Sequence, residues 1–381
     1  MRRLAFLLII AFPLATFGQD DLEKKTREGD AGIEAAARAA LARVRPAIVE
    51  VETIGAMPEK VEAAHDDPNA PGGTQDGVLA KKGFKQAFGP STGVAVGKEL
   101  VITSTFALKR EPRHVFVTRA DGKSFVATVL GKDEARMIAL LKVPGAELTP
   151  APEARSASIK VGGTALSIGR GYGTDAPAVS QGIVSAVGRQ SGRAIQTSAN
   201  VSPACYGGPL VSIDGEVMGV VVPLAGMGGM AGVDLYDSGI GFAIPMDDIR
   251  ALLPRLEKGE TLKPGMLGIT ADMGRTEEGV EVETIQPDST AAKMGLRSKD
   301  VIVEIDGKPI KGIGQLSQAI GRHVAGDKVK LVVERNGAAS EYEGDLGEYV
   351  RESMLKDANR HQPGQPGPRP PGPPPPGGQP Q

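Results

Sequence analysis

The sequence predicts a mostly β protein with a smaller second domain of mixed strands and helices. Three observations support this. At 381 residues, the chain is longer than one typical domain. It contains 51 glycines, and short apolar runs recur between turn signals from residue 91 to 244. Such spacing is typical of short strands in a sandwich or barrel. Past residue 360 the chain is nearly all Pro, Gly and Gln, which cannot form a core.

Residues 1–18 have the pattern of a secretory signal peptide. Arg2 and Arg3 precede an apolar run from Leu4 to about Ala15, followed by small residues. The run is shorter than the ~20 residues that a membrane-spanning helix needs. We therefore expect cleavage of this segment, a periplasmic or secreted protein, and no membrane span in the mature chain. A retained membrane anchor is the alternative.

The elements of the first domain, residues 31–258, follow from hydrophobic period and turn chemistry. An Ala-rich stretch with near-helical spacing predicts a helix that ends before Pro46, and alternation predicts a strand directly after it. Asp-Gly pairs between apolar runs predict two hairpins. The expected segments are a helix over 31–45, a strand over 47–52, a surface loop over 55–89, hairpin turns at 121–122 and 214–215, and a closing helix over 246–257.

The second domain spans residues 263–346. It opens with a Gly-rich segment, Gly265–Ile269, continues with strands, and contains two expected helices, over 290–294 and about 313–323. The stretch 347–359 is rich in charged residues, and a helix is one interpretation of this stretch. We expect residues 360–381 to be disordered or polyproline-like, either as a spacer or as a ligand for a proline-binding domain.

Composition argues against several classes of function. The net charge is −2, so no overall positive field favours nucleic acid, and we expect no nucleic-acid partner. The chain has one cysteine, Cys205, which excludes an internal disulfide. Neither a Cys pair nor a His-x-x-His spacing is present. We therefore expect no metal and no cofactor.

Several motifs between residues 44 and 345 resemble the HtrA/Deg family, in which a trypsin-like double β-barrel precedes one PDZ domain. The segments that carry the resemblance are Val44–Val49, Ser91–Val94, Leu140–Val143, Gln181–Ser185, Ile195–Thr197, Gly207–Leu210, Gly239–Pro245, Ile285–Leu296 and Asp300–Ile310. The resemblance implies a double barrel for the first domain and an α+β PDZ fold for the second.

The catalytic positions that the resemblance implies are all replaced. Where the family has the general base His, this chain has Phe106. Met137 stands at the position of the orienting Asp, and Tyr206 at that of the nucleophilic Ser. Ala204 and Cys205 replace the Gly-Asn that precedes the nucleophile. The sequence therefore assigns no catalytic residue, and the triad is degenerate.

The replacement residues cannot carry out acyl transfer by this route. Phe and Met neither accept nor donate a proton, and a Tyr hydroxyl with a reference pKa of ~10 is neutral unless a base activates it. The four histidines, at positions 65, 114, 323 and 361, fall on no triad position, and we expect them to be exposed. A Cys205 nucleophile is the remaining alternative; a semi-buried, unreactive thiol is favoured.

A peptide-binding site is expected in the second domain. PDZ domains add a peptide C-terminus as a strand and hold its carboxylate with main-chain N–H groups. Met266, Leu267, Gly268 and Ile269 resemble that loop, and Leu316 and Ile320, four residues apart on a helix, would line the apolar pocket. The alternative for Leu316 and Ile320 is an ordinary core position.

The functional expectation is an HtrA-like pseudoprotease that binds peptide C-termini or unfolded proteins without hydrolysing them. One alternative is a serine-type endopeptidase acting in protein quality control. Another is a structural or regulatory subunit in a mixed oligomer with active relatives. The resemblance also implies a homotrimer or heterotrimer.

Overall fold

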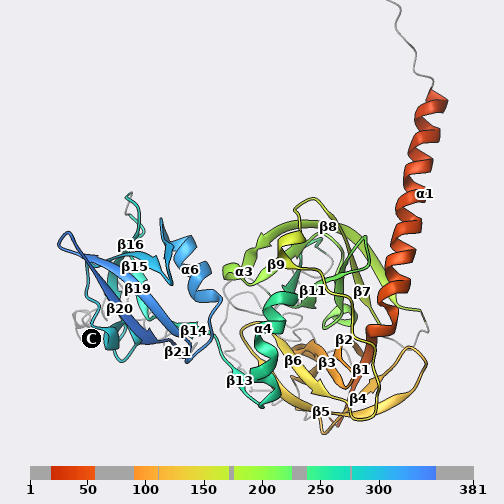
Figure 1. The fold of residues 1–381 in the computed structure, drawn as a ribbon, viewed down its shortest axis with the longest axis horizontal. Helices are drawn as coiled ribbons and strands as arrows, with labels where there is room; N and C mark the ends of the chain where they lie inside the picture. Colours follow the sequence, from red (N-terminus) through yellow and green to blue (C-terminus); the bar gives the residue numbers. More distant parts are fainter. Residues whose placement is uncertain are drawn as a thin grey trace, which may run out of the picture. The chain divides into compact units, whose positions relative to one another are not determined.

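The computed structural model describes residues 19–55, 90–109, 111–170, 176–224, 238–274 and 277–348. The predicted signal peptide, nearly all of the expected loop over 55–89 and the C-terminal tail lie outside these residues. The described chain forms two compact units that divide after Leu262, and residues 312–322 group with the first unit. Figure 1 shows the elements of each unit.

The first helix, α1 (Gln19–Val44), starts twelve residues before the predicted start at 31. The added residues lack apolar periodicity, so the hydrophobic pattern could not detect them, although Glu and Lys are good helix formers. Ala40 and Val44 are buried at its C-terminal end. Pro46 then lies in a short 3-10 turn, Arg45–Ala47, that leads into the first strand. None of the described helices is long and apolar enough to cross a membrane.

Six strands of the first unit close into one barrel. The strand order is β5-β4-β1-β2-β3-β6, and pairing of β5 with β6 closes it. The predicted Asp121–Gly122 turn joins β4 to β5, with Gly122 at a φ of 83°. The strands are β1 (Ile48–Ile54), β2 (Ser91–Gly97), β3 (Leu100–Ser104), β4 (His114–Thr118), β5 (Ser124–Asp133) and β6 (Ile138–Lys142).

A second closed barrel has the order β10-β11-β12-β9-β8-β7. The predicted Asp214–Gly215 turn joins β10 to β11. Helix α4 has the predicted bounds, Met246–Glu257, and β13 (Thr261–Leu262) adds to the first barrel beside β5. The barrel strands are β7 (Thr164–Gly169), β8 (Ala178–Gly188), β9 (Ala194–Thr197), β10 (Pro209–Ser212), β11 (Val217–Val222) and β12 (Gly241–Pro245). The mostly β fold with a double barrel is thus confirmed.

Short helical segments connect these barrel strands. Two of them carry positions discussed below: η2 (Thr105–Leu108) follows β3, and η4 (Pro203–Cys205) precedes β10. The others are η3 (Ser156–Ser158) before β7 and α3 (Arg189–Gly192) between β8 and β9.

The second unit is built on a sheet of order β15-β16-β17-β19-β20, with β18 beside β17. Helix α5 (Thr290–Met294) has the predicted bounds, and α6 (Ile313–Gly321) ends two residues before the predicted end. The strands are β14 (Gly265–Met266), β15 (Ile269–Ala271), β16 (Val280–Ile285), β17 (Val301–Ile305), β18 (Lys308–Pro309), β19 (Lys328–Arg335), β20 (Ala338–Asp345) and β21 (Gly347–Glu348).

A buried ion pair fixes the start of β17. Asp300 is 1% exposed and accepts two hydrogen bonds from the Arg335 guanidinium, at 2.7 and 2.8 Å. It also accepts the Arg297 N–H at 2.7 Å. The hydrogen bond from Arg335 is the main cause that lowers the pKa of Asp300 below its ordinary value. The carboxylate is therefore ionised at neutral pH and links β17 to the end of β19.

Candidate functional site

Phe106, the first of the three residues that the resemblance places at triad positions, lies in the short turn η2. Ser104 begins this turn, because its hydroxyl accepts the N–H of Phe106 at 3.2 Å. The Phe106 side chain is 5% exposed. A residue at this depth contributes to the core by removing a large aromatic surface from water.

Met137 lies directly beside this turn. Its carbonyl oxygen accepts the Thr105 N–H at 2.9 Å and the Ser104 hydroxyl at 3.2 Å. Its backbone is left-handed, with a φ of 58°, which is uncommon for a residue with a side chain. The side chain is half-buried. The main chain of Met137 is therefore joined by hydrogen bonds to the two residues that precede Phe106.

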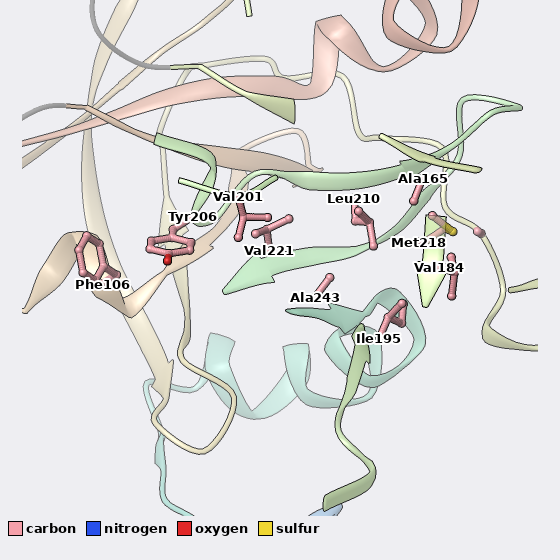
Figure 2. Close-up of a cluster of buried hydrophobic side chains, with 11 residues drawn as sticks. Phe106, Ala165, Val184, Ile195, Val201, Tyr206, Leu210, Met218, Val221 and Ala243 are labelled. Atoms are coloured by element: carbon pink, nitrogen blue, oxygen red, sulfur yellow. The ribbon is translucent and has the colours of Figure 1, made fainter. Parts of the chain in front are cut away.

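Tyr206, at the third position, contacts Phe106 directly. Their ring centroids are 5.2 Å apart and the planes meet at 72°, an edge-to-face arrangement. Figure 2 shows the two rings side by side, with Val201 and Val221 next to Tyr206. Tyr206 is 6% exposed and belongs to the core cluster that runs through the second barrel to Met218. Edge-to-face pairs stabilise by roughly 0.5–1.5 kcal/mol beyond the burial of their area.

In the loop before Tyr206, main-chain N–H groups donate to carbonyls of the same loop. Residues Pro203–Cys205 form the 3-10 turn η4, and the N–H of Tyr206 donates to the carbonyl of Pro203 at 3.3 Å. In serine proteases the nucleophile's own N–H is one of the donors that bind the oxyanion. Here the corresponding N–H already has an acceptor within the chain. Both Ala204 and Cys205 are buried.

Thr92, for which the sequence predicted no role of its own, holds this loop against the first barrel. Its hydroxyl lies 2.6 Å from the carbonyl oxygen of Ala204 and accepts the Arg170 N–H at 2.6 Å. Its main-chain N–H donates to the carbonyl of Tyr206 at 3.3 Å. A Cβ at Gly207, where φ is 87°, would lie 2.2 Å from the Thr92 carbonyl oxygen. The glycine after the third position is thus required by close backbone packing.

The remaining candidates for proton transfer lie elsewhere or are buried. His114 is exposed at the start of β4, as predicted. His323 was predicted to be exposed, but its side chain is only 26% exposed, and its Nε2 lies 2.9 Å from an Asp306 carboxylate oxygen. The second carboxylate beside the ring is that of Asp327, 3.6 Å from Nδ1. The contact with Asp306 arises from tertiary packing, so the sequence could not predict it. His65 and His361 lie outside the described residues. Cys205 is a buried free thiol, 3.7 Å from the Ser202 hydroxyl.

In the second unit, the segment 266–268 is held on one side by residues that precede or begin α5. The Met266 carbonyl lies 3.3 Å from the Thr290 hydroxyl. The Leu267 carbonyl accepts the Ala291 N–H at 2.9 Å, and the Gly268 carbonyl accepts the Gln286 N–H at 2.9 Å. Because a trans peptide unit points its N–H opposite to its C=O, the N–H groups of residues 267–269 face away from segment 286–291.

Two of these N–H groups have no acceptor within the described part of the chain: those of Leu267 and Gly268. Gly268 has a φ of 81°, and a Cβ there would lie 2.2 Å from Cβ of Ser289, so a glycine is required. Ser289 caps α5 by accepting the Ala292 N–H at 3.2 Å. Consecutive main-chain N–H groups that point the same way form a concavity that suits an anion.

The predicted pocket residues lie on α6. Leu316 is 3% exposed and Ile320 is half-buried. Helix α6 groups with the first unit of the structure, whereas segment 265–269 belongs to the second. The role of Leu316 and Ile320 as lining of a peptide pocket stays a prediction.

Comparisons with known proteins identify both domains. The trypsin-like peptidase domain family matches residues 91–220, and the PDZ domain family matches residues 265–346. The periplasmic pH-dependent serine endoprotease DegQ of Escherichia coli is 30% identical over 326 residues, which cover 77% of this chain and 70% of DegQ. The putative serine protease HhoA of Synechocystis is 28% identical over 322 residues, covering 77% of this chain and 79% of HhoA.

A solved structure agrees with these relatives. The HtrA-type protease AlgW with a decapeptide superposes with a TM-score of 0.58 at 25% identity, over 82% of this chain and 98% of AlgW. The similarity therefore extends through both the barrels and the PDZ domain. The chain belongs to the HtrA family, in which a trypsin-like peptidase domain is followed by a PDZ domain.

Proposed function

We propose that this protein is a periplasmic or secreted peptide-binding member of the HtrA family whose peptidase domain does not hydrolyse peptide bonds. It captures the C-termini of peptides or unfolded proteins through its PDZ domain. One observation carries the first half of this proposal: the Phe106 and Tyr206 rings pack edge to face at 5.2 Å where a base and a nucleophile would meet.

Acyl transfer by this route needs a nucleophile, a base that takes its proton, and a group that orients the base. At the first two positions in question, Phe106 and Met137 have no group that can accept a proton. Tyr206 has a hydroxyl and its ring is buried, but neither of the other two positions supplies a base that could take the hydroxyl proton. The contact between Phe106 and Tyr206 argues that this part of the predicted site has become part of the core.

The Tyr206 N–H supports the same conclusion by a separate route. An oxyanion site needs donors that are unoccupied and aimed at the developing charge, and losing one costs roughly 10²–10³ in turnover. Here that N–H donates to Pro203. Electrostatic stabilisation of a tetrahedral intermediate would first require the η4 turn to open.

Peptide binding is supported by the geometry of segment 266–269. The N–H groups of Leu267 and Gly268 are without acceptors in the described chain, and they suit a terminal carboxylate. The neighbouring strand β15 is at the edge of its sheet. The Gln286 N–H donates to the Gly268 carbonyl, one residue beyond the opposed pair Ile269 and Ile285. In an antiparallel ladder this pattern makes Ile269 and Ile285 a non-hydrogen-bonded pair. The N–H and C=O of Ile269 therefore face the free edge, where an added strand would pair.

The binding half of the proposal is tested by titrating the full chain with a fluorescent peptide that ends in apolar residues and a free carboxylate. We expect saturable binding, weakened at least about tenfold when the terminal carboxylate is amidated, because one charge-assisted set of hydrogen bonds is lost. An unrelated acidic peptide of equal length and charge is the control. Absence of binding at millimolar peptide would reject this half.

A serine-type endopeptidase is the second candidate, and the relatives favour it, since DegQ is a serine endoprotease. In this candidate Tyr206 would be the nucleophile. A phosphonylating reagent that traps activated hydroxyl nucleophiles would then label Tyr206, and mass spectrometry of the digested protein would locate the label. We expect no label on Tyr206 under conditions that fully label DegQ.

A further inference from the structure

We infer that Asp272 is a specificity-determining residue of the PDZ site, and that it selects a basic side chain, Lys or Arg, at the fourth residue from the C-terminus of a bound peptide. This inference rests on the proposed peptide-binding function and names the class of peptide that the site takes. The register of β15 carries it, because Asp272 directly follows this edge strand.

A peptide bound at β15 runs antiparallel to this strand. Its carboxylate lies at the N–H groups of Leu267 and Gly268, just before Ile269, the first residue of β15. A chain that ends there and pairs along β15 must run in the opposite direction. The last peptide residue then stands opposite Ile269, because its carboxylate takes the place of the carbonyl that would accept the Ile269 N–H in an antiparallel pair.

The main chain of Asp272 continues the pairing of β15 with β16. Its N–H donates to the Glu281 carbonyl at 2.9 Å, one residue beyond the opposed pair Ala271 and Val282. The N–H and C=O of Ala271 therefore face the free edge, as those of Ile269 do. An added peptide makes its hydrogen-bonded pairs there, with its last and third-last residues. Its fourth-last residue stands opposite Asp272.

The pair at Asp272 brings two side chains close together. It is a non-hydrogen-bonded pair, in which the Cα atoms lie only about 4.5 Å apart and both side chains are on the same face. That face is the solvent side of the sheet, since Thr270 and its partner Thr284 are exposed and Asp272 is half-buried. Opposite charges at such a pair stabilise the ladder and like charges destabilise it. A basic fourth-last residue is therefore favoured over an acidic one.

The charges around Asp272 leave its carboxylate available to an incoming cation. Its Oδ1 accepts the Gly274 N–H at 2.8 Å, which holds the side chain in a local turn. The Lys299 ammonium lies 2.8 Å from a Glu281 carboxylate oxygen. This hydrogen bond is the main cause that raises the pKa of Lys299 above its ordinary value, and the charges of Asp272 and Glu283 add to the shift. One ammonium group thus faces three carboxylates, and the surface beside the edge is negative.

The experiment measures binding of the full chain to two peptides that share an apolar C-terminal residue and a free carboxylate and differ only in a Lys or a Glu at the fourth-last position. At low ionic strength, where exposed charges are least screened, we expect the Lys peptide to bind about fivefold more tightly. Asp272→Asn keeps an acceptor for the Gly274 N–H and should abolish this preference, and Asp272→Lys should reverse it. Glu343→Gln, which removes a charge from β20 at the opposite edge of the sheet, should keep the wild-type ratio.

Each outcome decides one statement. If the wild-type chain binds neither peptide, the proposed function fails. If it binds both equally, the inference is wrong and the proposed function stands. A preference that persists in folded Asp272→Asn, or that is lost equally in Glu343→Gln, would also overturn the inference. If Asp272→Asn does not fold, the Lys and Glu are moved to the fifth-last peptide position, where successive side chains of a strand point to the other face. A preference for Lys of the same size there would overturn the inference.

Discussion

Replacing Tyr206 by serine is expected to lower the free energy of unfolding of the first unit by about 3–5 kcal/mol, the cost of truncating a buried aromatic side chain, and to create no hydrolysis. The ring is 6% exposed and packs on Phe106. Its removal leaves a cavity and places a polar hydroxyl among apolar neighbours. Without a base at position 106, the new serine would not be activated.

The measurement is chemical denaturation followed by a probe of the first unit, with peptide turnover recorded on the same samples. Phe125→Ser provides a matched control, because Phe125 is a half-buried aromatic residue in the same unit, and we expect a smaller loss. If Tyr206→Ser lowers the free energy of unfolding less than Phe125→Ser does, Tyr206 is not a core residue. Turnover gained by Tyr206→Ser would show that a base is within reach.

Gly268→Ala is expected to weaken binding of a free-carboxylate peptide by about a hundredfold, which corresponds to ~2.7 kcal/mol. The backbone here has a φ of 81°, and the new Cβ would lie 2.2 Å from Cβ of Ser289. The loop must shift, and the N–H groups of Leu267 and Gly268 then lose their alignment. Because these donors are main-chain groups, loop shape decides affinity more than side-chain identity does.

Gly307→Ala is the matched control for this substitution. Gly307 lies in the same unit at a φ of 75°, but a Cβ there meets nothing within 4 Å. It therefore carries the same backbone strain, about 1 kcal/mol, without the clash at the loop. Calorimetric titration should show near wild-type affinity for Gly307→Ala. Equal weakening in both variants would mean that general strain, and not the loop, explains the loss.

Much of the fold could be predicted because local chemistry and tertiary structure agree. Asp121–Gly122 and Asp214–Gly215 form the predicted hairpin turns, and α4 and α5 have the predicted bounds. Helix α1 was predicted too short, since its charged first half has no apolar period to reveal it. The Pro- and Gly-rich tail lies outside the described residues, so its interpretation stays a prediction.

The site was only partly predictable. Family motifs pointed to Phe106, Met137 and Tyr206 one by one, but the ring contact between barrels and the bond from the Tyr206 N–H to Pro203 arise from tertiary packing. Thr92 and Thr290 lie in segments that carry the resemblance, but the sequence predicted no role for either hydroxyl, because a threonine is usually a surface residue. Their buried hydroxyls link segments 112 and 24 residues away along the chain, and spacing alone does not reveal such links.

The measurement that tests the central claim most directly is hydrolysis of unfolded casein by the full chain at high enzyme concentration, with Tyr206→Phe beside it and active DegQ as the positive control. We predict that the wild-type protein and Tyr206→Phe both release peptides at the rate of the buffer blank. Cleavage by the wild type that disappears in Tyr206→Phe would contradict the claim, because it would make the buried phenol a working nucleophile.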